Sequence, residues 1–426
     1  MNNKKIKVLL IIEQCNPEWF SVPLVGYNYY NQISKLVNTT LVTHERNKEA
    51  FEKQRKSENT KIIYINESEF IKKYYKVISL ISSKPLGGVV WPLLHTLSYP
   101  MYAEFNQKVY QLFKDSIIKS DYDIVHAITP MIPRYPVKVV QACQNTPFII
   151  GPVNGGVPFP PAFQETAKKE NANLNFLRNV GRFLIPGYRE TYQKATRVLA
   201  GSTYTLNMLK NLFNLPDNQI SLFYENGIPE NFVTQPKQKK QNGEKINLLF
   251  VGRLVPYKCA DIVIQAISYL DTSLQNQIQL TIVGDGEEKN NLEKQVKDLN
   301  LSHLVKFTGL IPQAETLTYY NQADIFCFPS IREFGGAVVL EAMASGLPCI
   351  VVNNGGIGEY VTEETGFKIE PTSKNYLIQE VTDKIKLLVT DENLRLNMSA
   401  NAIERAKEFV WKNKAQKILT IYEHLK

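Results

Sequence analysis

The feature that most constrains the fold of this 426-residue chain is a regular alternation of two kinds of segment. Short apolar runs rich in β-branched residues alternate with helix-length amphipathic segments along almost the whole sequence. Such runs are typical of strands buried in a parallel sheet, and the segments between them are typical of crossover helices. We therefore predict an α/β protein built from doubly wound parallel sheets.

The pattern divides into two halves, each with its own set of strands. In the first half we expect strands at residues 7–12, 40–42, 61–65, 124–127, 148–150 and 197–200. In the second half we expect them at 247–251, 279–283, 305–308, 324–328, 348–352 and 366–369, with helices at 260–270, 289–299, 314–321 and 336–344. The chain is long enough for two domains with separate cores, at 1–233 and 246–403. A polar stretch at 234–245 is expected to be an exposed linker, and residues 404–426 a final helical segment.

Charge is distributed unevenly between the halves. Residues 1–235 hold 27 Lys and Arg against 18 Asp and Glu, a balance of +9, and the remainder holds 22 against 23, a balance of −1. Basic and aromatic residues are interleaved at 70–94, a pattern that suits either an anionic membrane surface or a solvated basic face. No basic motif of a known nucleic-acid module is present, so we expect no nucleic-acid partner.

Five scattered cysteines, mostly inside apolar runs, indicate a reducing compartment rather than a disulfide framework. The basic start lacks the form of a signal peptide, and no apolar run approaches the ~20 residues of a membrane span. We expect a cytoplasmic protein, at most peripheral on the inner face of the membrane.

Residues 330–348, SIREFGGAVVLEAMASGLP, carry the strongest chemical signal. Glu333 and Glu341 bracket Gly335 and Gly336, which follow an expected strand and precede an expected helix. Glycines at a helix start aim backbone N–H groups and the positive helix end at an anion. Carboxylates are poor phosphate ligands but good acceptors for hydroxyl groups, so the segment predicts a nucleotide-sugar site.

This segment resembles the signature of the retaining glycosyltransferases of family four, the group-one glycosyltransferases. Glu333 and Glu341 keep the E-x7-E spacing, and AMASGLP matches the end of the signature. VGRLVPYKCADIVIQA, IVGDGEE, VKFTGLI and YYNQADIFCFPS also occur in the family's order, whereas the first half matches more loosely. The resemblance implies a GT-B fold, in which two Rossmann-like domains face each other across a cleft. It places the acceptor on the first domain and the donor on the second, with the last helix crossing back.

The resemblance also assigns roles to residues of the second half. Arg253 and Lys258 would hold the donor diphosphate and stabilise its charge as it leaves. Glu333 would contact the transferred sugar at the reacting centre, and Glu341 would accept hydroxyls of the ribose. A larger donor-binding set is completed by Gly252, Ile311, Gly335, Gly336, Ala337 and Val338. Ile311 is the candidate nucleobase contact, although its turn is equally well explained as a plain strand end.

Two places in the first half are candidate acceptor or cleft residues. Asn154, Gly155 and Gly156 of the GPVNGG segment follow a strand and either line the cleft or form a structural turn. His126 ends another strand, where many relatives have a second histidine two residues later; here that position is Ile128. Either His126 serves in catalysis or no histidine does.

We therefore expect a retaining hexosyltransferase that moves a sugar from a nucleoside-diphosphate sugar to a saccharide or lipid-linked acceptor, in cell-surface polysaccharide or glycolipid synthesis. The alternatives are a nucleotide-sugar epimerase and a non-catalytic nucleotide-sugar-binding subunit of the same fold. A nicotinamide dehydrogenase is disfavoured because no G-x-G-x-x-G follows the first strand. No cofactor or metal is expected, since no residue cluster has metal-ligand spacing and the 121–123 DYD segment is better explained as a solvated turn.

Overall fold

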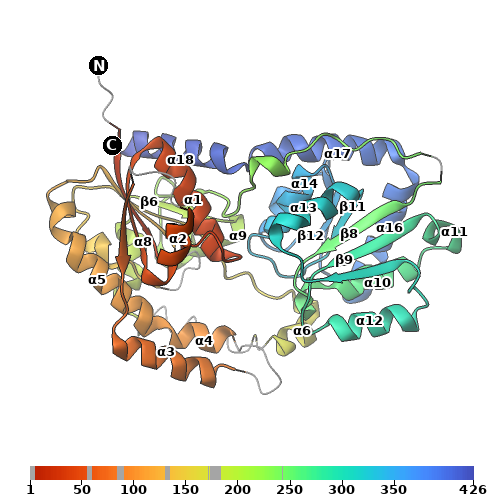
Figure 1. Cartoon of the computed structure of the whole chain (residues 1–426), viewed down its shortest axis with the longest axis horizontal. Helices are drawn as coiled ribbons and strands as arrows, with labels where there is room; N and C mark the ends of the chain where they lie inside the picture. The colour runs from red at the N-terminus through yellow and green to blue at the C-terminus, as the bar shows by residue number, and fades with distance from the viewer. Residues whose placement is uncertain are drawn as a thin grey trace. The chain divides into compact units, whose positions relative to one another are not determined.

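The computed structural model describes residues 5–54, 60–83, 91–129, 135–170, 172, 184–241 and 243–426. Contacts divide the chain into two compact units. The first contains Met1–Gly156, Asn171–Glu225 and Trp411–Lys426, and the second contains Val157–Glu170 and Asn226–Val410. Figure 1 shows a sheet with covering helices in each unit.

The first unit is built on a seven-stranded parallel sheet of order β3-β2-β1-β4-β5-β6-β7. Its strands are β1 (Lys7–Ile12), β2 (Asn38–His44), β3 (Lys61–Ile65), β4 (Ile124–Thr129), β5 (Phe148–Val153), β6 (Arg197–Ala200) and β7 (Ile220–Leu222). Its α-helices are α1 (Val22–Leu36), α2 (Lys48–Gln54), α3 (Glu69–Ile81), α4 (Trp91–Leu97), α5 (Tyr99–Ile118), α8 (Tyr188–Lys194), α9 (Thr203–Phe213) and α18 (Trp411–Leu425). Short 3-10 turns lie at η1 (Glu45–Asn47) and η2 (Lys138–Gln141).

Alternation along β1 builds the core on both faces of this sheet. Leu9 and Ile11 point to one face, where they pack with residues of α5, α8 and α9. Val8 and Leu10 point to the other, where they pack with residues of α1 and α18. The carboxy-terminal helix α18 is therefore part of the first unit's core.

The second unit is built on a six-stranded parallel sheet of order β10-β9-β8-β11-β12-β13. Its strands are β8 (Ile246–Val251), β9 (Ile278–Val283), β10 (Val305–Gly309), β11 (Ile325–Phe328), β12 (Cys349–Val352) and β13 (Gly366–Ile369). Its α-helices are α6 (Gln164–Lys169), α10 (Ala260–Ser268), α11 (Thr272–Gln275), α12 (Lys289–Asp298), α13 (Gln313–Gln322), α14 (Ala337–Ala344), α15 (Gly356–Tyr360), α16 (Lys374–Thr390) and α17 (Glu392–Lys407). The 3-10 turns are η3 (Pro161–Phe163), η5 (Glu230–Phe232) and η6 (Pro256–Lys258).

Each sheet has a switch point, where chain connections leave two neighbouring strands in opposite directions. In the second sheet it lies between β8 and β11, which pair through Leu248 and Ile325. The carboxyl ends of strands at such a point leave a crevice where ligands bind in open α/β sheets. The loops that follow β8 and β11 therefore mark the first place to look for a site.

The predicted α/β class and all twelve predicted strands are confirmed, with ends within three residues of those expected. The strand β7 was not expected, because its three residues carry too little periodicity to stand out.

The observed units differ from the expected domain boundaries. Ile228 pairs with the chain at Phe409 and Val410, and this pairing draws both 226–233 and 404–410 into the second unit. The expected linker at 234–245 is partly anchored there: Lys237 donates from Nζ to the carbonyls of Tyr320 and Asn321, at 3.0 and 2.8 Å.

Candidate nucleotide-sugar site

The turn after β8 is formed by backbones that lie unusually close together. Gly284 has a φ of 143°, and a Cβ atom there would overlap the carbonyl oxygen of Gly252. A Cβ atom at Gly286 would likewise overlap the carbonyl oxygen of Leu254. Only glycine fits such a contact, so the ends of β8 and β9 form a compact edge of bare backbone.

Lys258 and Glu333 form an ion pair at this edge. Lys258 lies in η6 after β8 and Glu333 in the loop after β11; their side chains are 11% and 15% exposed. The ammonium group also lies over the ring of Phe328, 4.9 Å from its centroid. Two opposite charges that are nearly removed from water hold each other strongly, so this pair fixes the two loops against one another.

Arg253 lies in the same turn but is exposed. Its guanidinium donates a hydrogen bond from Nη2 to the hydroxyl of Tyr257, at 2.8 Å. The carbonyl of Tyr257 accepts hydrogen bonds from the amide of Ile331 and the hydroxyl of Ser330, at 3.0 and 3.3 Å. Hydrogen bonds to the backbone carbonyl of Tyr257 thus join the loops after β8 and β11, in addition to the ion pair.

Cys259 follows Lys258 and adopts the left-handed conformation, with a φ of 56°. A residue with a Cβ atom is uncommon in this conformation, which glycine adopts without strain. The turn ends at Cys259, and α10 begins at the next residue.

The Gly335–Gly336 turn is held by a second close backbone contact. The carbonyl of Glu333 accepts a hydrogen bond from the amide of Gly356 at 3.2 Å, and a Cβ at Gly355 would overlap that carbonyl oxygen. Gly336, with a φ of 49°, leads into α14, whose first residues are Ala337 and Val338. No side-chain hydrogen bond caps this helix start. Uncapped amides at a helix start suit an anion, and the donor contacts expected here stay predictions.

Glu341 is buried in α14, and its Oε2 accepts a 2.9 Å hydrogen bond from the hydroxyl of Tyr320 in α13. Burial and the nearby Glu341 carboxylate raise the pKa of Tyr320, so the phenol stays protonated and donates. The carboxylate of Glu341 therefore has a structural partner within the unit, and its ribose contact stays a prediction. Sequence reasoning missed Tyr320, which lies in a helix with no chemical motif.

Ile311 lies just beyond β10 and is half-buried, next to Leu310, which is 76% exposed. Gly309 ends β10 with a φ of 75° and pairs with Gly284, so this turn adjoins the glycine edge of β8 and β9. The nucleobase contact of Ile311 stays a prediction.

Arg332 is a further residue that sequence reasoning missed. Its Nε donates to the carbonyl of Val157 at 2.8 Å, and its guanidinium lies between the rings of Phe159 and Phe334, 4.8 and 5.0 Å from their centroids. Asn354 adds hydrogen bonds from Nδ2 to the carbonyls of Pro158 and Ile331. Residues 157–159 are thereby fixed to the loop that carries Glu333.

In the first unit, His126 is fully buried and does not line a cleft, which corrects its expected placement. Its Nε2 lies 2.8 Å from the carbonyl of Gly151 and its Nδ1 lies 2.7 Å from the hydroxyl of Tyr422 in α18. Burial lowers the pKa of His126 to about 4, so the ring is neutral at pH 7. It anchors the carboxy-terminal helix to the first sheet.

Asn154 is also buried, and its side chain is used within the first unit. Its Nδ2 donates to Glu225 at 2.8 Å, and its Oδ1 accepts from the hydroxyls of Ser202 and Thr205 at 3.1 and 3.0 Å. Gly155 and Gly156 are buried with φ values of 134° and 85°. These contacts give GPVNGG the structural role that was the alternative; an acceptor contact there stays a prediction.

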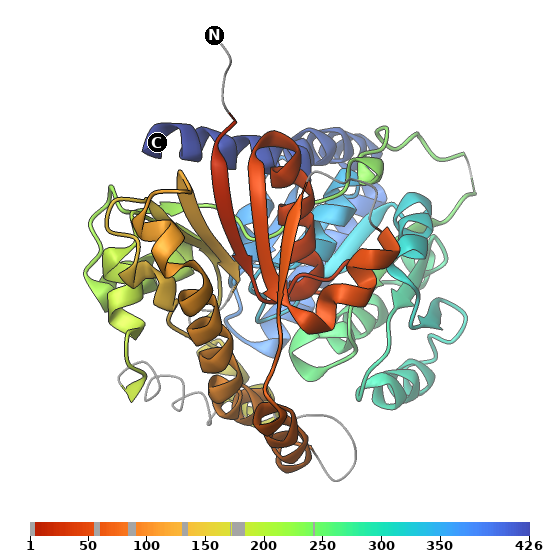
Figure 2. The ribbon, with the colours of Figure 1, turned by 60° about the vertical axis from the view of Figure 1, so that its left-hand side comes forward.

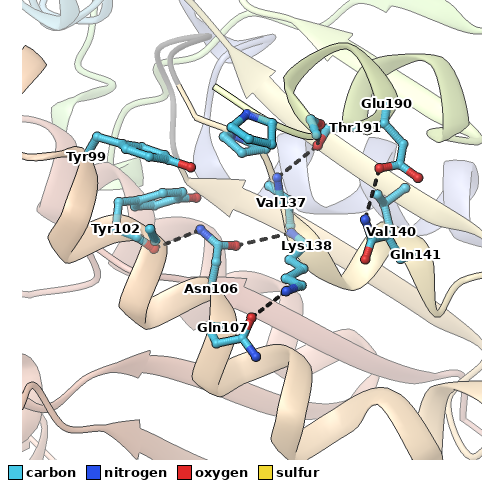
Figure 3. Close-up of a pocket in the computed structure, with 14 residues that line it drawn as sticks. Tyr99, Tyr102, Asn106, Gln107, Val137, Lys138, Val140, Gln141, Glu190 and Thr191 are labelled. Atoms are coloured by element: carbon cyan, nitrogen blue, oxygen red, sulfur yellow. Dashed lines mark hydrogen bonds between the residues drawn. The ribbon is translucent and has the colours of Figure 1, made fainter. Parts of the chain in front are cut away.

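Figure 3 shows a pocket of about 250 Å³ within the first unit, between α5, η2 and α8. Its polar groups pair with one another: Lys138 donates to Gln107, and Gln141 donates from Nε2 to Glu190 at 3.0 Å. These pairs hold the walls of the pocket together.

Within the described part of the chain, no helix is both long and apolar enough to cross a membrane. The same residues contain no group of three or more His, Cys, Asp or Glu side chains arranged to hold a metal ion.

Comparison with known proteins places this site in context. A family model described as "Glycosyl transferases group 1" matches residues 231–405. The D-inositol 3-phosphate glycosyltransferase of Corynebacterium glutamicum is 30% identical over 179 residues, which cover 41% of this chain and 42% of that protein. The chain thus aligns with less than half the length of this curated relative.

Solved structures match over nearly the whole chain. HepE from Anabaena in complex with UDP has a TM-score of 0.63 at 17% identity, covering 98% of this chain and all of that one. Sucrose-phosphate synthase from Thermosynechococcus elongatus has a TM-score of 0.65 at 19% identity, covering 99% of each chain. At such identities the likeness shows the fold alone. Residues 231–405 therefore match the group 1 glycosyl transferases, in a chain with the two-sheet GT-B fold.

Proposed function

We propose that this protein is a retaining glycosyltransferase that moves a hexose from a nucleoside-diphosphate sugar to a saccharide or lipid-linked acceptor. The observation that carries the proposal is the Lys258–Glu333 pair beside the uncapped start of α14, at the switch point of the second sheet. HepE has been solved with UDP and with UDP-glucose, which supports a nucleotide-sugar donor.

In this proposal the diphosphate lies against the backbone edge at Gly252 and the amides of Ala337 and Val338. Lys258 and Arg253 supply positive charge to the same group. Glu341 accepts ribose hydroxyls, and Ile311 contacts the base. No metal is needed, because the two cations and the helix start provide the compensating charge.

The chemical step breaks the bond between the anomeric carbon and the diphosphate oxygen, and the electron pair leaves with the diphosphate. Positive charge that develops on the sugar is stabilised by Glu333. The acceptor hydroxyl attacks from the face that the diphosphate leaves and gives its proton to a departing phosphate oxygen. Configuration is retained, and no protein base is required, in keeping with the buried position of His126.

The proposal extends to the setting of the reaction: a cytoplasmic enzyme, peripheral on the inner face of the membrane, that builds a cell-surface polysaccharide or glycolipid. The basic balance of residues 1–235 supports contact with anionic lipid or with a phosphate-bearing acceptor.

The test is a product assay with the common UDP and GDP sugars and a panel of saccharide and lipid acceptors. We expect Arg253→Ala and Lys258→Ala each to lower transfer at least about 100-fold, because each removes a charge that stabilises the leaving group. Lys240→Ala is the matched control, since Lys240 pairs with the buried Asp324 just before β11, 3.0 Å away. Wild-type transfer rates in both site variants contradict the assigned roles. If the protein binds the donor but no acceptor is glycosylated, it is the non-catalytic alternative. If it converts the donor sugar without an acceptor, it is an epimerase.

A further inference from the structure

Helix α3 of the first unit carries an exposed apolar surface that the proposed chemistry does not use. Phe70, Val77, Leu80 and Ile81 are 72%, 53%, 77% and 60% exposed. With Tyr75, they make up five of the sixteen large apolar side chains that are exposed in the described part of the chain. So dense a group on one 13-residue helix needs an explanation, whereas single exposed apolar residues do not.

A neighbouring face of α3, about a quarter turn around the helix from Phe70, accounts for its position in the unit. Ile71 and Ile78, one seven-residue repeat apart, are buried, and the half-buried Tyr74 donates its hydroxyl to the carbonyl of Leu97 at 2.8 Å. The helix is therefore packed and fixed along one stripe. Ser68 caps its start by accepting from the amide of Ile71.

The exposed residues of α3 are arranged as an apolar stripe with lysines beside it. Phe70, Val77 and Ile81 are spaced by seven and four residues, which places them in one stripe along the helix. Lys73 and Leu80 form the neighbouring stripe, and Lys72 and Lys76 lie beyond it, all exposed. Lys72 pairs with Glu69 at 2.9 Å, whereas Lys73 and Lys76 make no ion pair with any described residue.

We propose that α3 binds the surface of an anionic membrane, lying in its plane. The apolar stripe would enter the boundary between headgroups and acyl chains, and the lysines beside it would meet anionic headgroups. A protein partner would match the apolar stripe equally well, but the unpaired lysines and the +9 balance of residues 1–235 favour a lipid surface.

The location of α3 fits this role. It follows the carboxyl end of β3, and Figures 1 and 2 show it beyond the ends of the first sheet's strands. Ligands of open α/β sheets bind at that edge. A lipid-linked acceptor would thus be held by the same membrane on which α3 rests, which deepens the proposed function by favouring the lipid-linked class. Residues 84–90 of the basic, aromatic segment expected at 70–94 lie outside the described residues.

The test measures binding of the full chain to vesicles of phosphatidylcholine alone and to vesicles that also contain phosphatidylglycerol, without donor or acceptor. We expect binding only to the anionic vesicles, weakened by salt. The double variant Phe70→Ser/Leu80→Ser should lower the partition coefficient at least about tenfold, because it removes the two most exposed apolar side chains of the helix. Lys73→Gln/Lys76→Gln should lower it by about 25-fold, since each lysine near such a surface contributes about fivefold.

Tyr376→Ser/Leu387→Ser is the matched control, because both residues are exposed on α16 of the second unit. The proposal is overturned if the protein binds neutral and anionic vesicles equally or binds neither. It is also overturned if the control variant loses as much of the partition coefficient as the α3 variants. A dimer, seen by light scattering, that Phe70→Ser/Leu80→Ser dissociates overturns it as well. Transfer to a water-soluble acceptor should be unchanged in the α3 variants, so failure of this proposal is distinguishable from failure of the proposed function.

Discussion

His126 and Tyr422 lie 296 residues apart in the chain and meet at 2.7 Å in the interior of the first unit. The carbonyl of Gly151 can only accept, so the Nε2 of the neutral ring carries the proton and donates to it. The Nδ1 atom is then an acceptor, and the hydroxyl of Tyr422 donates to it. The pair fixes both the histidine tautomer and the position of α18.

Tyr422→Phe should destabilise the first unit, because it leaves the Nδ1 atom of His126 buried without its donor. We expect a loss of about 1–3 kcal/mol in the free energy of unfolding, measured by urea denaturation. Tyr27→Phe is the control, since the Tyr27 hydroxyl donates to Gln54 in an exposed setting and should cost little. Equal stabilities of the Tyr422 variant and the wild type would show that this hydrogen bond contributes nothing.

Stability should also fall with acid between pH 6.5 and about 4. Burial lowers the pKa of His126 from 6.5 to about 4, so the unfolded chain binds a proton in this range that the folded chain does not. The stabilisation is fully present above pH 6.5 and is lost as the pH falls, by at most about 3 kcal/mol for this residue. Burial lowers the pKa of His44 to about 4 as well, and this adds to the same slope.

The measurement is the free energy of unfolding across this pH range for the wild type and for His126→Gln. The variant should be less stable overall. Its free energy of unfolding should depend less steeply on pH, because one fewer proton is taken up on unfolding. An NMR titration of the His126 ring is an independent check, and a midpoint near 6.5 contradicts a buried, neutral histidine.

The sequence was sufficient to predict the two sheets, because buried parallel strands such as β1 and β11 consist of nearly continuous apolar residues. It also placed Lys258 and Glu333 in loops that follow strands, although it did not predict the strand order that makes β8 and β11 neighbours. It could not predict that the two form an ion pair, since their loops meet only through tertiary packing. Likewise His126 at a strand end looks the same in sequence whether it faces a ligand or, as here, a distant helix.

The ion pair of Lys258 and Glu333 predicts opposite effects on binding and on transfer. In the free protein Glu333 competes with the diphosphate for Lys258, so Glu333→Gln should tighten UDP binding by about fivefold, or ~1 kcal/mol, while lowering transfer at least about 100-fold. Calorimetry and the product assay measure the two effects. Lys258→Met/Glu333→Gln replaces the pair without leaving a buried charge and should bind UDP more weakly than either the wild type or Glu333→Gln. Weaker binding by Glu333→Gln alone contradicts this account.

The contacts of Arg332 predict that its loss will loosen residues 157–163. Arg332→Ala removes the hydrogen bond to Val157 and the cation between Phe159 and Phe334, so amides of residues 157–163 should exchange with solvent at least about tenfold faster. Arg332→Lys should restore little, because an ammonium cannot reproduce the planar stack. Arg405→Ala is the matched control: its guanidinium lies over Phe409, 5.1 Å from the ring centroid, and its loss should leave residues 157–163 protected.

The close contact at Gly284 predicts that the edge formed by the ends of β8 and β9 tolerates no side chain. At a φ of 143°, Gly284→Ala is strained, and its Cβ would overlap the carbonyl of Gly252, so β8 and β9 must separate. We expect a loss above about 3 kcal/mol and loss of UDP binding, measured by thermal unfolding and calorimetry. Gly243→Ala is the control: its φ is 89°, but nothing lies within 4 Å of the added atom, so only the conformational cost of about 1 kcal/mol remains. Equal losses in the two variants would mean that strain, and not the close approach of β8 and β9, makes glycine necessary at position 284.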